Sequence, residues 1–303
     1  MSTSAVATPT QSSVSSASAV PPKAFSFYQY DPSIVAAAIF IFLFLATTAW
    51  HCLQTFKKRT FYFIPLIVGG CFEWWGYIAR IFAHYNMDSQ GVFIAQTLLL
   101  LLPPSLFAAS IYMILGRLIH FTSGESMAPI RAERLTKIFV GGDVIAFLLQ
   151  AGGGSMLAKA ATQDTGKIVV IVGLLVQIGF FGFFVVTSFK FHRRMGASPT
   201  SASMRGNWQK YMYALYGASA LILARSVFRI AEFAGGHEST LMSNEVYMYV
   251  FDGVLMVGVM VIFNVIHPGG IIGRSGHIKG AMPLNGMQSG WDDGSESFIR
   301  GRR

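Results

Sequence analysis

Seven long apolar segments dominate this sequence, and each can cross a membrane as a helix of about 20 residues. The predicted spans are Ser33–Leu53, Phe61–Ala83, Val92–Gly116, Thr136–Leu157, Ile168–Phe189, Tyr211–Phe233 and Val246–Ile266. Pro268 ends the last one, because proline cannot continue a helix. The sequence therefore predicts an all-α polytopic membrane protein, a seven-transmembrane-helix bundle.

The composition agrees with a membrane as the solvent. Hydrophobic residues make up 53% of the chain and charged residues 12%, against about 25% charged in soluble proteins. The net charge of +9 does not indicate nucleic-acid binding, because most basic residues lie in short gaps between the apolar segments. We expect membrane lipids, not nucleic acid, as partners, and the sequence identifies no protein partner.

The distribution of Lys and Arg predicts the orientation. The connections after the first, third and fifth spans hold twelve of them, and the other side of the membrane receives three, Lys23, Lys159 and Lys167. The positive-inside rule places the twelve in the cytoplasm. We therefore expect the N-terminus outside and the C-terminus in the cytoplasm.

Both ends differ in composition from the bundle. Residues 1–27 are rich in Ser, Thr, Ala and Pro and show no cleavable signal peptide, so the first span is expected to direct insertion. Residues 271–303 are polar and rich in Gly and Ser. We predict a disordered extracellular tail over 1–27, a transmembrane domain over 28–270 and a disordered cytoplasmic tail over 271–303.

Charged residues inside the spans are the main functional signal. A charge at the bilayer centre costs at least ~2.5–3.5 kcal/mol, so such residues are expected to pair or to line a pathway. Six of them fall in the predicted outer half: Glu73, Arg80, Arg225, Arg229, Glu232 and Asp252. Two interpretations remain open: a polar substrate pocket that opens towards the outside, and a buried ion-pair network that fixes helix register.

Helical spacing supports pairing within this set. Glu73 and Arg80 are seven residues apart and share a helix face, as do Arg225, Arg229 and Glu232. Asp143 is the one intramembrane charge in the predicted inner part of the bundle, with Arg117 as its candidate partner.

Three polar residues in the fourth and fifth spans form a second candidate group. Asp143 and Gln150 are seven residues apart on the fourth span, and Gln177 lies in the fifth. We assign Asp143, Gln150 and Gln177 to proton coupling or an inner gate.

Proline and glycine mark two further features. Pro103 and Pro104 lie in the middle of the third span and predict a kink, either a hinge or a static bend. Gly152, Gly153 and Gly154 follow no phosphate-binding pattern, and they predict close helix packing or unwinding at the end of the fourth span.

No metal or cofactor is expected. His51 and His267 fall at the predicted cytoplasmic ends of the first and seventh spans, but no third ligand is evident. The seventh span contains no Lys, which excludes a retinal-binding rhodopsin.

Motifs in all seven spans resemble the fungal lipid-translocating exporter family, called RTA-like for resistance to aminocholesterol. The matching stretches are Tyr30–Pro32, Glu73–Tyr77 with Arg80, Leu102–Pro104, Ala108–Tyr112, Gly142–Asp143, Gln150–Gly153, Gly173–Gln177, Arg225–Arg229 with Glu232, Glu245–Asp252 and His267–Gly269. The paired prolines depart from the family's single proline. The resemblance covers about residues 28–270.

The resemblance implies a non-enzymatic transporter or translocator of amphiphilic lipids, such as sphingoid long-chain bases or sterol-like toxicants, in the plasma membrane. The alternative is a seven-helix lipid receptor or sensor that signals through its basic cytoplasmic loops. In the first case, the outer-half acids would bind the cationic head of the lipid.

Overall fold

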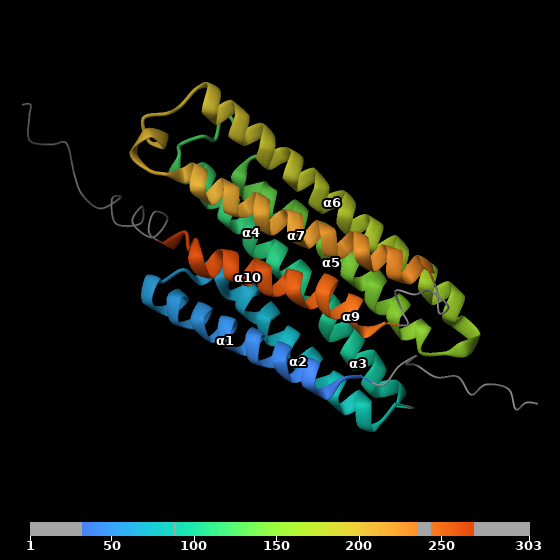
Figure 1. Cartoon of the computed structure of the whole chain (residues 1–303). Helices are drawn as coiled ribbons and strands as arrows, with labels where there is room; N and C mark the ends of the chain where they lie inside the picture. The colour runs from blue at the N-terminus through green and yellow to red at the C-terminus, as the bar shows by residue number, and fades with distance from the viewer. Residues whose placement is uncertain (1–31, 88, 236–243, 270–303) are drawn as a thin grey trace, which may run out of the picture.

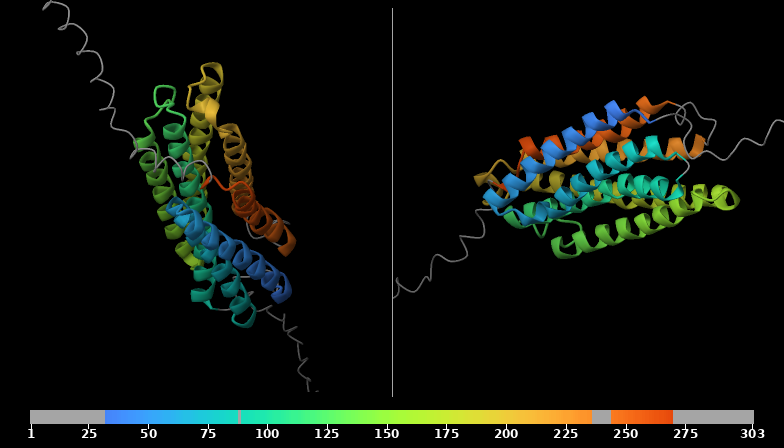
Figure 2. Two further views of the ribbon diagram at one scale, coloured as in Figure 1. Left: turned by 90° about the vertical axis from the view of Figure 1, so that its left-hand side faces the viewer. Right: turned by 90° about the horizontal axis from the view of Figure 1, so that it is seen from below.

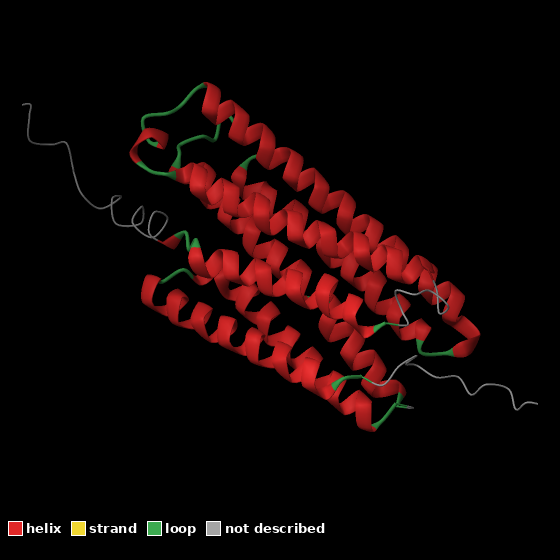
Figure 3. Ribbon diagram, viewed as in Figure 1, coloured by secondary structure: helices red, strands yellow, loops and turns green. Residues whose placement is uncertain are grey.

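The computed structural model describes residues 32–87, 89–235 and 244–269. Within those ranges the chain forms helices joined by short loops and no strand (Figure 3). Seven helical segments in this part of the chain are long and apolar enough to cross a membrane, as the sequence predicts. The chain is therefore an integral, multi-pass membrane protein. Both predicted tails, 1–27 and 271–303, lie outside the described residues.

The first four spans are α1 (Ile34–Lys58), α2 (Ile64–Tyr85, after the short η1, Phe61–Phe63), α3 with α4 (Gln90–Leu101 and Pro103–Phe121) and α5 (Ala132–Leu157). The fifth and sixth are α6 (Gln163–Ala197, after η2, Ala160–Thr162) and α7 (Trp208–Gly235, after η3, Ser203–Arg205). The seventh consists of α9 (Glu245–Met248), the π-helical turn η4 (Tyr249–Val254) and α10 (Leu255–Val265).

The helices extend beyond the predicted apolar segments. The largest difference is at α6, which has 35 residues where the sequence predicts Ile168–Phe189. A helix of that length spans ~50 Å at about 1.5 Å per residue, more than the ~30 Å hydrocarbon core. Hydropathy detects the membrane-embedded part of a helix, and polar residues such as Lys190 and Arg194 continue the same helix into water.

The third span occupies the centre of the bundle. Its α4 half packs against α2, α5, α6 and α7, whereas α1 packs mainly on α2 and α10 (Figures 1 and 2). Within its most apolar window, 67% of the third span is buried, against 28% for the first. A change in the shape of α3 and α4 would therefore reach most other helices.

The outward faces of the helices are apolar. Large hydrophobic side chains such as Val35, Phe42, Leu148 and Val227 are more than half exposed. An apolar surface of this extent would associate or aggregate in water, so these faces contact lipid acyl chains.

Glycine allows α5 and α6 to approach closely. A Cβ on Gly153 would lie 2.7 Å from the Gly166 carbonyl oxygen, whereas a Cβ on the neighbouring Gly152 would meet nothing within 4 Å. Helix α5 continues to Leu157. Of the two explanations for the three glycines, close packing is therefore correct at Gly153, and unwinding is wrong.

Candidate functional site

Five charged side chains meet between α2, α7 and η4, and we call them the charge cluster: Glu73, Arg225, Arg229, Glu232 and Asp252. Arg225 Nε pairs with Asp252 Oδ1, and Arg229 Nη2 lies 2.5 Å from Asp252 Oδ2. Arg229 Nη1 also contacts Glu232 Oε2 at 3.0 Å. One carboxylate therefore forms ion pairs with both arginines of α7.

The helix geometry explains this convergence. Arg225, Arg229 and Glu232 lie on one face of α7 at intervals of four and three residues. Asp252 lies on the π-helical turn η4, and such turns often occur at functional sites. The turn packs tightly, because a Cβ on Gly253 would lie 2.6 Å from the Tyr77 hydroxyl. The local helix distortion thus brings Asp252 between the two arginines.

A backbone carbonyl of the third span also joins the cluster. Pro104 has no N–H, so it cannot donate to the carbonyl of Leu100 four residues earlier. Arg225 Nη2 donates to that oxygen at 2.5 Å. The helix is interrupted at Leu102, between α3 and α4, where the sequence predicts the kink. Arg225 therefore connects the proline break to Asp252.

Glu73 is the member of the cluster without a hydrogen bond. It is 1% exposed and lies within electrostatic reach of Asp252, Arg225 and Arg229, yet neither carboxyl oxygen has a hydrogen-bond partner. The buried hydroxyl of Tyr77, one turn further along α2, has no hydrogen-bond partner either. Buried polar atoms are normally satisfied, so α2 presents two unsatisfied groups to the cluster.

Arg80 does not pair with Glu73, the residue on its own helix face. Its Nη2 atom lies 2.8 Å from Oε1 of Glu245, the first residue of α9. The same oxygen accepts from the backbone N–H of Ser33 at 2.9 Å. Glu245 therefore joins the start of α1, the end of α2 and the start of the seventh span.

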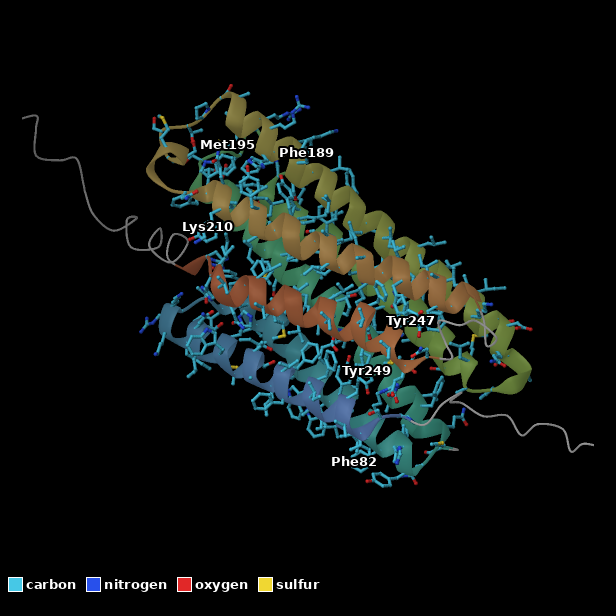
Figure 4. All side chains as sticks on the ribbon, viewed as in Figure 1. Phe82, Phe189, Met195, Lys210, Tyr247 and Tyr249 are labelled. Carbon is cyan, nitrogen blue, oxygen red and sulfur yellow. The ribbon has the colours of Figure 1, made fainter. Side chains whose placement is uncertain are left out.

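Aromatic rings pack beside the ion pair of Arg80 and Glu245. Phe40, Phe44, Tyr77 and Tyr249 stack with centroid distances of 5.2–5.8 Å. Arg80 Nε donates to the Tyr249 hydroxyl at 3.1 Å (Tyr249 is labelled in Figure 4). The rings form an apolar wall, made by α1, α2 and η4, beside the unsatisfied groups of α2.

The proposed partner of Asp143 is wrong. The Arg117 guanidinium lies 4.4 Å from the ring centroid of Tyr62, and Asp143 Oδ2 instead accepts from the Tyr112 hydroxyl at 2.8 Å. Arg117 is long enough to turn towards the helix end, as lysines and arginines near membrane interfaces do.

The other two members of the second candidate group do meet. Gln150 Nε2 donates to Gln177 Oε1 at 2.9 Å, and Gln177 Nε2 donates to Ser105 Oγ at 3.3 Å. These bonds join α5, α6 and α4 in one layer. Asp143 lies two turns away from Gln150 and is not part of that layer.

His51 and His267 both stack on Phe63 at the opposite end of the bundle. Gly269 N–H donates to His267 Nδ1, so Nε2 carries the proton and donates to Thr60 Oγ1 at 3.4 Å. Burial, with Lys58 and His51 nearby, lowers the pKa of His267 to about 4. In the described ranges, no group of three or more His, Cys, Asp or Glu residues is placed to hold a metal.

A cavity of about 340 Å³ lies at the connection between α6 and α7. Its lining includes Met195, Pro199, Met204 and Trp208. It is remote from the charge cluster, whose side chains are buried against each other. An outward-opening pocket around the cluster remains a prediction.

Some residues of the site were given no role from the sequence, although Tyr77, Glu245 and Tyr249 fall in the stretches that carry the family resemblance. Glu245 precedes the predicted seventh span by one residue, so it is counted outside the membrane. Tyr77 and Tyr249 look like ordinary span residues, and a backbone carbonyl such as that of Leu100 has no sequence signal except the proline four residues later.

Comparison with known proteins identifies the relatives. The family model described as "RTA1 like protein" matches residues 66–275, more than half of the chain. The chain belongs to the RTA1-like family. This confirms the resemblance inferred from the motifs. No solved structure matches the chain.

Three relatives of this RTA1-like protein carry functional names. Protoporphyrin uptake protein 1 of Saccharomyces cerevisiae is 35% identical, over 80% of this chain and 91% of its own length. The probable lipid transporter atnI of Emericella nidulans is 31% identical, over 82% and 68%. The sphingoid long-chain base transporter RSB1 of Saccharomyces cerevisiae is 26% identical, over 72% and 67%. The names describe transport and not enzymatic reactions.

Proposed function

We propose that this RTA1-like protein translocates amphiphilic lipids with a cationic head, such as sphingoid long-chain bases, and that it is not an enzyme. The names of two relatives, a probable lipid transporter and a sphingoid long-chain base transporter, support the substrate class. The plasma membrane is the proposed location, and microscopy of a fluorescently tagged chain would check it.

The observation that carries the proposal is the unpaired carboxyl group of Glu73. Three acids of the charge cluster, Glu73, Glu232 and Asp252, face two arginines. With all five ionised, the cluster has one uncompensated negative charge. A single ammonium group would balance it and would satisfy the oxygens of Glu73, because an opposite charge and hydrogen bonds both favour a buried carboxylate.

The surroundings of Glu73 suit an amphiphile. The Tyr77 hydroxyl has an unused acceptor and donor beside the proposed ammonium site. The aromatic wall of Phe40, Phe44 and Tyr249 offers ring faces to a cation and apolar surface to the adjoining chain. The lipid tail would remain between apolar helix faces while the head crosses.

The connection through Arg225 suggests how binding is linked to movement. An ammonium that competes for Asp252 would weaken the ion pair between Asp252 and Arg225. Arg225 also bonds to Leu100 at the proline break, so its displacement would free the junction of α3 and α4. Because these helices form the centre of the bundle, the change would be transmitted to the other spans.

The test is the movement of a fluorescent long-chain base across liposomes that contain the purified protein. We expect Glu73→Gln to lower the rate about tenfold or more, the effect of losing ~1.4 kcal/mol of interaction. The matched control is Glu133→Gln, the same change at an exposed position in the first turn of α5. It should keep the wild-type rate.

Folding must be measured on the same samples. Because Glu73 has no hydrogen bond to lose, Glu73→Gln should remain folded and monodisperse. Loss of folded protein would instead support the structural ion-pair interpretation. Saturable binding of the base without movement in the wild type would reject transport and favour a receptor.

A further inference from the structure

A second acid is buried without a cation, far from the charge cluster. Asp143 on α5 is 2% exposed, and its Oδ1 atom has no hydrogen-bond partner. Its other oxygen accepts from Tyr112. Among the ion pairs of the described residues, none includes Asp143. This carboxyl group therefore has one neutral partner and one open acceptor.

The elements packed around Asp143 offer no charge to pair with it. Helix α3 contains no ionisable residue. On α4 the groups that titrate or carry charge are Tyr112, Arg117, at the Tyr62 ring, and exposed His120. On α6 the Phe184 ring contacts Tyr112. The titratable residues of α6 nearest in sequence to Phe184 are Lys190, which is exposed, and His192, which contacts Tyr216.

Large ligands are excluded by the packing at this level. The Tyr112 ring lies 4.6 Å from the Phe184 centroid and 5.3 Å from that of Phe139. A Cβ on Gly142, next to Asp143, would clash with the Phe180 ring. In such an apolar site an unpaired carboxylate is expensive and the neutral acid is favoured. The ligand that neutralises Asp143 without needing space is a proton.

A separate polar layer lies two turns from Asp143 along the same helix interface. Two turns further along α5, Gln150 bonds to Gln177, which bonds to Ser105 on α4. Helix α4 runs antiparallel to α5, and Ser105 is two turns before Tyr112 on it. The spacing from Tyr112 to Ser105 on α4 therefore matches the spacing from Asp143 to Gln150 on α5. In the predicted orientation the direction from Asp143 to Gln150 is outward.

We propose that Asp143 is a proton-binding site through which the protein uses a proton gradient. The proton enters from the outer side past the Gln150, Gln177 and Ser105 layer, binds Oδ1 and later leaves to the inner side, while the lipid moves outward. Tyr112 acts as a positioning residue, because its hydroxyl fixes the carboxyl group through Oδ2. The coupling rests on the proposed transport function, whereas proton binding by Asp143 does not.

The first experiment measures fluorescent long-chain base movement in liposomes with and without an imposed pH gradient. We expect the gradient to accelerate the wild type severalfold. Asp143→Asn, which resembles the permanently neutral acid, should move lipid at one rate with or without the gradient. The control Asp164→Asn, at an exposed acid in the first turn of α6, should keep the acceleration. A wild type that ignores the gradient, or a variant that still responds, would overturn the coupling.

The second experiment detects the proton directly by infrared spectroscopy of the wild-type protein across a pH titration. A carboxylic acid band should be present that Asp143→Asn removes and that Tyr112→Phe shifts, because this variant loses the bond to Oδ2. Asp164→Asn should leave the band unchanged. If Asp143→Asn does not fold, the shift in Tyr112→Phe decides. A titration without such a band would refute the site, even if the protein proves to move no lipid.

Discussion

Glu245 shows how a single acid connects distant parts of this chain. One of its oxygens accepts from the guanidinium of Arg80 and from the backbone N–H of Ser33, which itself caps α1 through its side chain. Asp252 has a similar role with Arg225 and Arg229. Glu245 joins helix ends. Asp252 lies at the centre of the charge cluster.

The pairing of Arg80 with Glu245 can be tested by a double-mutant cycle. We expect Arg80→Gln and Glu245→Gln each to lower the free energy of unfolding by about 3 kcal/mol. This is the lower end of the range for breaking a buried ion pair, because Glu245 is partly exposed. The double variant should lose clearly less than the sum of the two changes. Denaturant unfolding in detergent provides the measurement.

The matched control combines Arg80→Gln with Glu73→Gln, the pair that helix spacing alone would suggest. These two changes should be additive, because no ion pair joins the side chains in the structure. Strong coupling between residues 73 and 80, with none between 80 and 245, would contradict the structure.

At the residue scale, the sequence predicted which charged residues lie together better than how they pair. Charges in apolar segments stand out, so all five members of the charge cluster were identified. Partners across helices depend on the rotation of each helix and on side-chain reach, which spacing does not encode. Arg117 illustrates this, because its length lets it reach the Tyr62 ring instead of Asp143.

Two helical irregularities in the third and seventh spans shape the charge cluster. The break at Leu102 exposes the Leu100 carbonyl to Arg225, and the π-helical turn η4 carries Asp252. The proline pair makes the first irregularity predictable. The second was not predicted from the sequence, where Asp252 stood out only as a charge, and the close approach of Gly253 to Tyr77 becomes evident in the folded bundle.

The two prolines are expected to differ in importance. Pro104→Ala would supply an N–H that can bond to the Leu100 carbonyl four residues earlier, in competition with Arg225. Pro103→Ala would supply one for Leu99, whose carbonyl has no contact with the charge cluster. We expect lipid movement in liposomes to fall severalfold in Pro104→Ala and to change little in Pro103→Ala.

Arg225→Lys provides a check on this explanation, since lysine lacks the forked geometry that serves Leu100 and Asp252 together. The rate of lipid movement should also fall in Arg225→Lys. The double variant with Pro104→Ala should show little further loss. Equal effects of the two proline variants would show that the bend itself, and not the freed Leu100 carbonyl, matters.

Across the whole molecule, charge is distributed unevenly between the two ends of the bundle. The connections α1–α2, α4–α5 and α6–α7 lie at one end of the bundle (Figure 1), and these connections together with the adjoining helix ends contain the twelve Lys and Arg residues counted in the sequence. The charge cluster and the pair of Arg80 with Glu245 lie towards the other end. The number of spans followed directly from hydropathy, because each span must be long and apolar enough to cross the bilayer by itself. The orientation follows from charge alone and stays a prediction.

Orientation can be measured with single cysteines on a background in which Cys52 and Cys71 are replaced by serine. Intact cells are treated with a maleimide that cannot cross membranes. We expect labelling of Asn86→Cys, in the exposed connection between α2 and α3, and none of Ser126→Cys, between α4 and α5. After permeabilisation both should react. The reverse pattern would place twelve basic residues outside, against the positive-inside rule. It would also turn the charge cluster, Glu73 included, towards the cytoplasm, so that the lipid head would enter the bundle from the inner leaflet.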